Sequence, residues 1–147
     1  MTNSKNNFLT LDQVIDNAIQ NETQAASFYH KMQSIVTKSE VVGLLQILEK
    51  EEMQHLETLN QYKKNYKCIK SYIQFTPDVS LTLPSSEACK ELGIGDMLNK
   101  AIEIEEKSAA YYLNLSNILT GEAKELFEGL AKFEESHIYK LKHFLLY

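Results

Sequence analysis

The sequence predicts an all-α protein, a bundle of four helices in two antiparallel hairpins that a long crossover connects. Apolar residues recur at helical spacing in four segments. The 147 residues include only 5 Gly and 2 Pro, too few for a turn-rich β fold. The four segments are separated by a short, a long and again a short connection, and short connections make neighbouring helices antiparallel.

The first two helices are expected at about 11–37 and about 40–66. Thr10 is the expected N-cap of the first helix, and Gln13 completes a capping box with it. Ser39 is the expected N-cap of the second helix. About two residues remain between these helices, which is enough for a tight hairpin.

The last two helices are expected at about 96–119 and about 122–146, with Asp96 as the N-cap of the third. The segment 67–95 contains both prolines and both cysteines, and it is expected to be the crossover. Its roughly 29 residues can span up to about 95 Å, whereas a helix of about 27 residues is only about 40 Å long. The crossover can therefore run the whole length of the bundle, and residues 1–147 are expected to form a single domain.

Charge and composition exclude several classes of function. The net charge is −5 and all 15 basic residues are lysines, so the arginine-bearing basic face of a nucleic-acid-binding protein is missing. The first ten residues are polar, and no apolar run approaches the roughly 20 residues that span a bilayer. We therefore expect a cytoplasmic protein that does not bind membranes.

The cysteines and glycines exclude several cofactors. Cys68 and Cys89 cannot form a CxxC pair, so no rubredoxin-type iron site is expected. Two free thiols are expected, with a single bridge between them as the alternative. The glycines form no G-x-G-x-x-G motif, so no flavin is expected, and no haem is expected either.

An internal repeat relates the two hairpins. Residues 18–29 and 101–112 are identical at five of twelve positions, and so are residues 48–59 and 130–141. Two hairpins of the same design are expected to pack about a pseudo-twofold axis. The repeat matches the following pairs: Glu22 with Glu105, Tyr29 with Tyr112, Glu52 with Glu134, and His55 with His137.

The matched acidic residues and histidines interrupt the apolar stripes of their helices. Each Glu-x-x-His pair has i,i+3 spacing, so both side chains point to one face of the helix. Counted from the hairpin turns, all six residues lie at a height of about 20–24 Å. We therefore expect one cluster in the middle of the bundle: Glu22, Glu52, His55, Glu105, Glu134 and His137.

Four carboxylates in an apolar core need a counter-charge, because burying unpaired charge is very costly. The chain has no arginine, and no lysine falls on the inward stripes. A single Glu-x-x-His motif is typical of a solvated helix face, but two matched copies indicate a dinuclear metal site. Carboxylate and imidazole ligands favour two Fe ions, with Mn or Zn as alternatives.

The remaining acidic residues and histidines are expected outside this cluster. Glu103 or Glu106 could replace Glu105 if the third helix rotated, but the repeat and the apolar stripe favour Glu105. His30 and His143 have no such partners and are expected at the surface or in packing. Six glutamates are expected to face solvent: Glu49, Glu51, Glu57, Glu103, Glu106 and Glu135.

Tyr29 and Tyr112 lie two turns after Glu22 and Glu105 on the same helix face. They either pack as core aromatics or hydrogen-bond to a ligand carboxylate, and in the second case they are candidate catalytic residues. Small residues near the expected ions leave space for a small substrate: Ala25, Ala26, Ser108 and Ala109.

Outward apolar residues suggest a homodimer, with extra core packing in a monomer as the alternative. These residues are Phe28, Leu44, Phe127 and Phe133.

The sequence resembles the rubrerythrin-like group of the ferritin-like superfamily from about residue 11 to 145. Two features differ from full-length rubrerythrins: a four-cysteine rubredoxin site is missing, and Ser108 stands where they have a further ligand glutamate. The remaining ligand set also resembles bacterioferritin and manganese catalase. The motifs that carry the resemblance are Glu22 with Tyr29, Glu52-Met-Gln-His55, Glu105 with Tyr112, and Glu134-Glu-Ser-His137.

The resemblance implies a ferritin-like four-helix bundle whose di-iron centre reduces hydrogen peroxide or reacts with dioxygen. An external electron donor such as a rubredoxin would then be required. Two alternatives use the same ligands: a ferroxidase that stores or transfers iron, and a manganese-catalase-like disproportionation of peroxide. A small-molecule oxidation or a sensing role is a further alternative, and the sequence alone does not choose among them.

Overall fold

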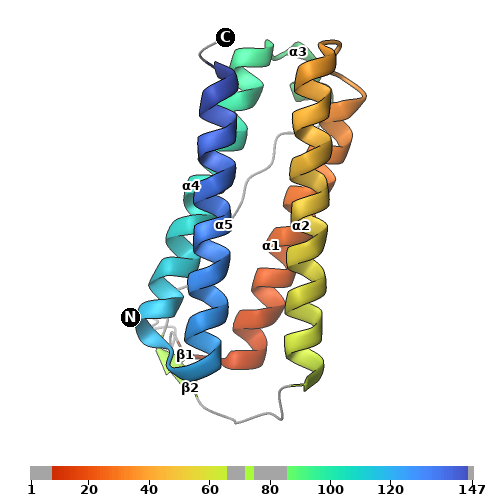
Figure 1. The fold of residues 1–147 in the computed structure, drawn as a ribbon. Helices are drawn as coiled ribbons and strands as arrows, with labels where there is room; N and C mark the ends of the chain where they lie inside the picture. Colours follow the sequence, from red (N-terminus) through yellow and green to blue (C-terminus); the bar gives the residue numbers. More distant parts are fainter. Residues whose placement is uncertain (1–7, 66–71, 75–85, 146–147) are drawn as a thin grey trace, which may run out of the picture.

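Four long helices lie side by side in two antiparallel pairs (Figure 1), as shown by a computed structural model that describes residues 8–65, 72–74 and 86–145. The first pair packs α1 against α2, and the second packs α4 against α5. The bounds of these helices are Leu11–Gln33 for α1, Ser39–Asn65 for α2, Ile94–Ile118 for α4 and Gly121–Leu145 for α5. This arrangement confirms the predicted all-α four-helix fold.

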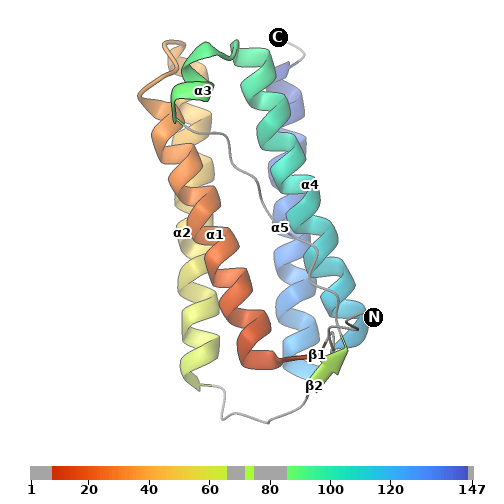
Figure 2. The same ribbon diagram turned by 180° about the vertical axis from the view of Figure 1, so that it is seen from behind.

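Three short elements lie at the ends of the bundle (Figure 2). Strands β1 (Phe8–Thr10) and β2 (Tyr72–Gln74) pair antiparallel at the end where α1 begins. Helix α3 (Ser86–Glu91) lies at the opposite end, beside the start of α4. The sequence did not predict these elements, because strands of three residues and a helix of six are too short to show a period. Most of the predicted crossover at 67–95 lies outside the described residues.

The start of α1 agrees with the prediction and its end does not. The hydroxyl of Thr10 accepts from the Gln13 N–H at 3.2 Å, and the Gln13 side chain accepts from the Thr10 N–H at 2.9 Å, which confirms the capping box. The helix ends at Gln33, four residues earlier than predicted. Three β-branched residues follow at 35–37, which lowers helix propensity, and Val36 packs into the core instead.

The starts of the other long helices are shifted by one or two residues. Ser39 is the first residue of α2 and not its N-cap. Helix α4 begins at Ile94 with Gly93 as its N-cap, so Asp96 lies in the first turn, where its carboxylate faces the positive end of the helix dipole. Helix α5 begins at Gly121, whose φ of 63° is in the left-handed region that favours glycine.

The core consists of two clusters of buried apolar residues, and it also contains several buried polar side chains. The prediction that Phe28, Leu44 and Phe127 face outward is wrong, because all three are buried in these clusters. Each helix of a bundle contacts neighbours on two sides, so its buried stripe is wider than a single row. Of the four residues named for a homodimer face, Phe133 is 54% exposed.

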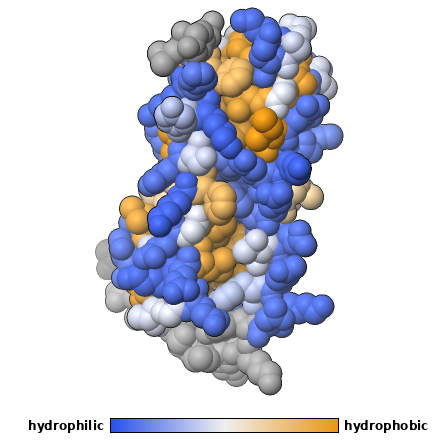
Figure 3. All heavy atoms as spheres, viewed as in Figure 1, coloured by the Kyte–Doolittle hydropathy of each residue, from blue (hydrophilic) through white to orange (hydrophobic). Residues whose placement is uncertain are grey.

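The surface over α2 and α5 mixes charged and apolar side chains (Figure 3). Its large exposed apolar residues are Ile47, Met53, Phe133 and Tyr139. Within the part of the chain that the structure describes, none of the helices has the length and apolar character that a bilayer crossing requires.

Candidate metal centre

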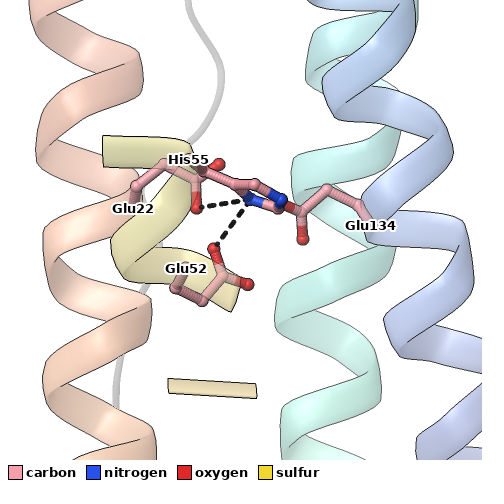
Figure 4. A group of neighbouring side chains, drawn as sticks. All are labelled: Glu22, Glu52, His55 and Glu134. Carbon is pink, nitrogen blue, oxygen red and sulfur yellow. Dashed lines mark ion pairs between the residues drawn. The ribbon is translucent and has the colours of Figure 1, made fainter. Parts of the chain in front are cut away.

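Six side chains from all four long helices converge inside the bundle. All six are buried, and the most exposed of them, His55, is only 5% exposed. Figure 4 shows four of them pointing toward one another from α1, α2 and α5. They are Glu22 from α1, Glu52 and His55 from α2, Glu105 from α4, and Glu134 and His137 from α5.

The six residues form two overlapping groups that share Glu52 and Glu134. Each group offers four ligand atoms that lie within 4.8 Å of one another. The first group adds Glu22 and His55 to the shared pair, and the second adds Glu105 and His137. The sequence repeat relates the two groups, because it matches Glu22 with Glu105 and His55 with His137.

In the first group, three carboxylates surround Nδ1 of His55 (Figure 4). The nearest oxygens are Oε2 of Glu22 at 3.5 Å, Oε2 of Glu52 at 3.4 Å and Oε1 of Glu134 at 3.4 Å. The ring itself stacks on the ring of His137, with centroids 5.6 Å apart and planes inclined by 14°.

In the second group, Nδ1 of His137 lies 3.0 Å from Oε1 of Glu52, 3.4 Å from Oε1 of Glu105 and 3.6 Å from Oε2 of Glu134. Glu52 and Glu134 therefore turn one oxygen toward each histidine. Glu22 faces only His55, and Glu105 faces only His137. Two shared and two terminal carboxylates are the arrangement expected of a carboxylate-bridged dinuclear site.

Many atoms of this cluster have no hydrogen-bond partner among the described residues. They are both carboxylate oxygens of Glu52, Oε2 of Glu105, Oε1 of Glu134, and Nδ1 of His55 and of His137. Buried polar atoms are nearly always satisfied, so a group of such atoms facing one another indicates an absent binding partner. Within the described ranges no lysine forms an ion pair with these four glutamates. Two divalent ions would match their charge, so the residues fit a pair of metal ions.

The histidines offset part of the carboxylate charge. Burial lowers the pKa of His55, but the carboxylates of Glu134 and Glu52 raise it more, to about 9. The same opposing effects raise the pKa of His137 to about 10. Burial likewise raises the pKa of Glu52, but its two histidine partners lower it by more. Two imidazolium groups can balance the charge of only two of the four carboxylates. A metal ion binds an imidazole only after the imidazole has lost the proton from the ligating nitrogen.

Tyr29 and Tyr112 each hydrogen-bond to the glutamate of the opposite hairpin. The Tyr29 hydroxyl donates to Oε1 of Glu105, and the Tyr112 hydroxyl donates to Oε1 of Glu22 at 2.7 Å. The structure shows both alternatives left open by the sequence, because the two rings are also fully buried in the apolar clusters. Burial raises the pKa of both phenols well above 10, so both remain donors at neutral pH.

Removing either of these hydroxyls is expected to destabilise the protein. Tyr29→Phe and Tyr112→Phe should each lower the free energy of unfolding by about 1–3 kcal/mol, because a buried carboxylate loses its donor. Urea denaturation measures the change. Tyr139→Phe is the matched control, since Tyr139 is 75% exposed, and it should stay within about 0.5 kcal/mol of wild type. Equal stabilities for all four proteins would contradict the importance of these bonds.

Glu51 contacts the cluster although the sequence did not predict it there. It was expected to face solvent, but its side chain is only 27% exposed. Oε2 lies 2.6 Å from Nε2 of His137, and Oε1 accepts from Nζ of Lys140 at 2.9 Å. Burial raises the pKa of Glu51, but Lys140 and His137 lower it by more, so it is a carboxylate at neutral pH. It stands four residues before His55 and so on the same face of α2, but this spacing alone does not show which helix it meets.

The remaining glutamates and histidines named from the sequence lie at the surface, except that Glu49 is partly buried in a pair with His30. Glu49 was also expected to face solvent, but it is partly buried and lies 2.9 Å from Nδ1 of His30 on α1. His30 and His143 are exposed, and Glu105, not Glu103 or Glu106, turns inward. The other four glutamates predicted to face solvent are exposed: Glu57, Glu103, Glu106 and Glu135. The predicted free thiols of Cys68 and Cys89 fall outside the described side chains and stay a prediction.

No family model and no curated protein matches the sequence. Among solved structures, the chain is similar to a Thermotoga maritima protein assigned to the ferritin-like diiron-carboxylate proteins. The TM-score is 0.83 at 20% identity, over 94% of this chain and 95% of that one. The fold is ferritin-like. A hypothetical protein from Pyrococcus furiosus has a TM-score of 0.70 at 23% identity, over 93% of this chain and 89% of that one.

A ferritin-like bundle accounts for the placement of the buried carboxylates. In the di-iron carboxylate proteins that have this fold, glutamates from two helices and Glu-x-x-His motifs from the other two project into the bundle. Here the single glutamates stand on α1 and α4, and the motifs stand on α2 and α5. The likeness to the two solved structures concerns the fold, so the case for metal rests on the donor atoms of this chain.

Proposed function

We propose that the protein is a non-haem di-iron oxidoreductase of the rubrerythrin type that reduces hydrogen peroxide at the buried centre. The observation that carries the proposal is the pair of overlapping donor groups, which share Glu52 and Glu134 and have unsatisfied atoms facing one another. Carboxylate and imidazole donors suit iron. With two ferrous ions bound, the centre supplies the two electrons that convert one peroxide and two protons to two waters.

Small buried residues beside the ligands support a small substrate. Ala26 and Ala109 lie one turn after Glu22 and Glu105, and Ser108 also faces inward. Their small size favours a molecule the size of peroxide or dioxygen over a larger organic substrate.

The two tyrosines would hold two of the ligand carboxylates in place and leave one oxygen of each for an ion. The hydroxyl of Tyr29 holds one oxygen of Glu105, and the hydroxyl of Tyr112 holds one oxygen of Glu22. The second oxygen of each glutamate remains directed at a histidine or unpaired, as Oε2 of Glu105 is. A glutamate anchored at one oxygen would keep its place and present the other oxygen to an ion.

Electrons for repeated turnover must come from outside these 147 residues, which include only two cysteines. A rubredoxin-type site needs four cysteines. We therefore propose an external donor such as a rubredoxin, and a cytoplasmic location in which such donors are found.

The proposal is tested by anaerobic titration of the ferrous protein with hydrogen peroxide. It should consume about one peroxide per pair of iron ions and then stop, because the centre holds two electrons. Reduced rubredoxin with its reductase should restore turnover. Peroxide loss is followed with a peroxide electrode, and oxygen with an oxygen electrode.

Two outcomes would overturn the peroxidase assignment. Sustained peroxide loss with oxygen release and no reductant would indicate a catalase-like disproportionation. Oxidation and retention of many more than two iron ions per chain would indicate iron storage. The control is Glu57→Gln, which changes an exposed glutamate of α2 and should behave as wild type.

A further inference from the structure

On the side that faces away from the carboxylate cluster, the two histidines have different surroundings. Nε2 of His137 lies 2.6 Å from Oε2 of Glu51. The other oxygen of Glu51 accepts a hydrogen bond from Lys140 at 2.9 Å, so this carboxylate is held at both ends. His137 is thus fixed from outside the metal centre by a residue on the facing helix.

The equivalent position in the other hairpin lacks this arrangement. The repeat that relates His55 to His137 places Phe133 where Glu51 would be and Thr58 where Lys140 would be. The ring of Phe133 packs on His55 with centroids 5.1 Å apart, and the hydroxyl of Thr58 donates to a backbone carbonyl of its own helix. Across residues 8–65, 72–74 and 86–145, no hydrogen bond to Nε2 of His55 is formed.

This difference affects how well each imidazole is prepared to bind a metal ion. A carboxylate only accepts hydrogen bonds, so Glu51 requires the proton on Nε2 of His137. When the ring is neutral, as metal binding requires, its lone pair is then on Nδ1, toward the centre. It also restricts rotation of the ring and makes Nδ1 a stronger donor. The ring of His55 has an apolar neighbour that fixes neither the tautomer nor the charge.

We infer that the two metal positions differ in affinity, the position formed with His137 and Glu105 binding its ion first and more tightly because Glu51 positions the imidazole. This inference rests on the proposed dinuclear centre. It adds that the two nearly symmetric hairpins build two unequal positions, and that the inequality comes from a residue that touches neither ion.

The inference is tested by titrating metal-free protein with Co²⁺, followed by calorimetry and by visible absorption. The wild type should bind two ions in two steps whose dissociation constants differ by about 10-fold or more. Glu51→Ala should weaken the tighter step by about 10–100-fold and leave the weaker step unchanged. Glu57→Ala, an exposed change two turns along the same helix, is the control and should alter neither step.

The converse variant transfers the arrangement to the other histidine. Phe133→Glu combined with Thr58→Lys should tighten the weaker step until the two steps approach one another. Both positions are exposed, so the fold should tolerate the exchange, and circular dichroism checks this. A merely structural role of Glu51 would predict no gain from this variant.

Three results would count against the inference. Equal affinities for both ions in the wild type would overturn it and leave the dinuclear centre intact. Equal weakening of both steps by Glu51→Ala would overturn the role of Glu51. Failure of the wild type to bind any Co²⁺ would instead overturn the dinuclear centre itself.

Discussion

Replacing both shared carboxylates, in the variant Glu52→Gln with Glu134→Gln, is expected to abolish metal binding. The wild type should bind about two Fe²⁺ per chain, and the variant essentially none. Glutamine keeps the volume of the side chain and removes its charge. Each of these glutamates faces both histidines, so the double change removes two anionic ligands from each metal position.

The size of this effect follows from charge balance. A divalent ion in a buried site is stable only if anionic ligands compensate the loss of its hydration shell. With two of the four carboxylates neutral, the two ions would carry twice the charge of the remaining glutamates, Glu22 and Glu105. Both positions would lose affinity together.

Metal content after gel filtration measures the outcome. The control is Glu57→Gln with Glu135→Gln, which removes two exposed charges from the same two helices and should leave about two ions per chain. Circular dichroism establishes that both variants are folded. An unchanged iron content in the variant of the shared pair would reject these residues as ligands.

Metal loading is expected to raise the melting temperature by about 10–20 °C. At a free metal concentration of about 100 times the dissociation constant, each site adds about 2.7 kcal/mol to the free energy of unfolding. Two sites add about 5 kcal/mol, and each kcal/mol raises the melting temperature of a chain of this size by about 2–4 °C. Mn²⁺ is a suitable probe because it is stable in air.

The ions are expected to stabilise the folded protein because all four long helices contribute ligands, so the unfolded chain cannot bind the ions in the same way. Differential scanning calorimetry with and without a chelator measures the shift. In the variant of Glu52 and Glu134 the melting temperature should not respond to Mn²⁺. A shift of the same size in that variant would mean that the ions stabilise the protein from somewhere else.

The long elements and the polar cluster could be predicted from the sequence because both depend on periodicity. Apolar residues at helical spacing locate four helices, and Glu22 or His137 stands out by interrupting such a stripe. The repeat supplied the second half of the pattern. The ferritin-like fold was predictable for the same reason, since short, long and short connections allow few arrangements of four helices.

What the sequence did not reveal depends on contacts between helices. Glu51 lies outside the inward stripe of α2, and only the approach of α5 gives it His137 and Lys140 as partners. Phe28 and Phe127 were placed outside because one helix seen alone does not show where its second neighbour lies. The early end of α1 reflects burial of Val36, a tertiary contact that overrides the continuing helical pattern.

The crossed hydrogen bonds of the two tyrosines have a consequence for local unfolding. Tyr29 and Tyr112 each belong to one hairpin and satisfy a carboxylate of the other, so neither hairpin can open alone without leaving a buried charge on its partner. Backbone amides near Glu22 and Glu105, which stand 83 residues apart, then exchange with solvent only in the same opening event. The middle of the bundle behaves as one cooperative unit, whereas the helix ends, beyond the reach of these bonds, are free to fray separately.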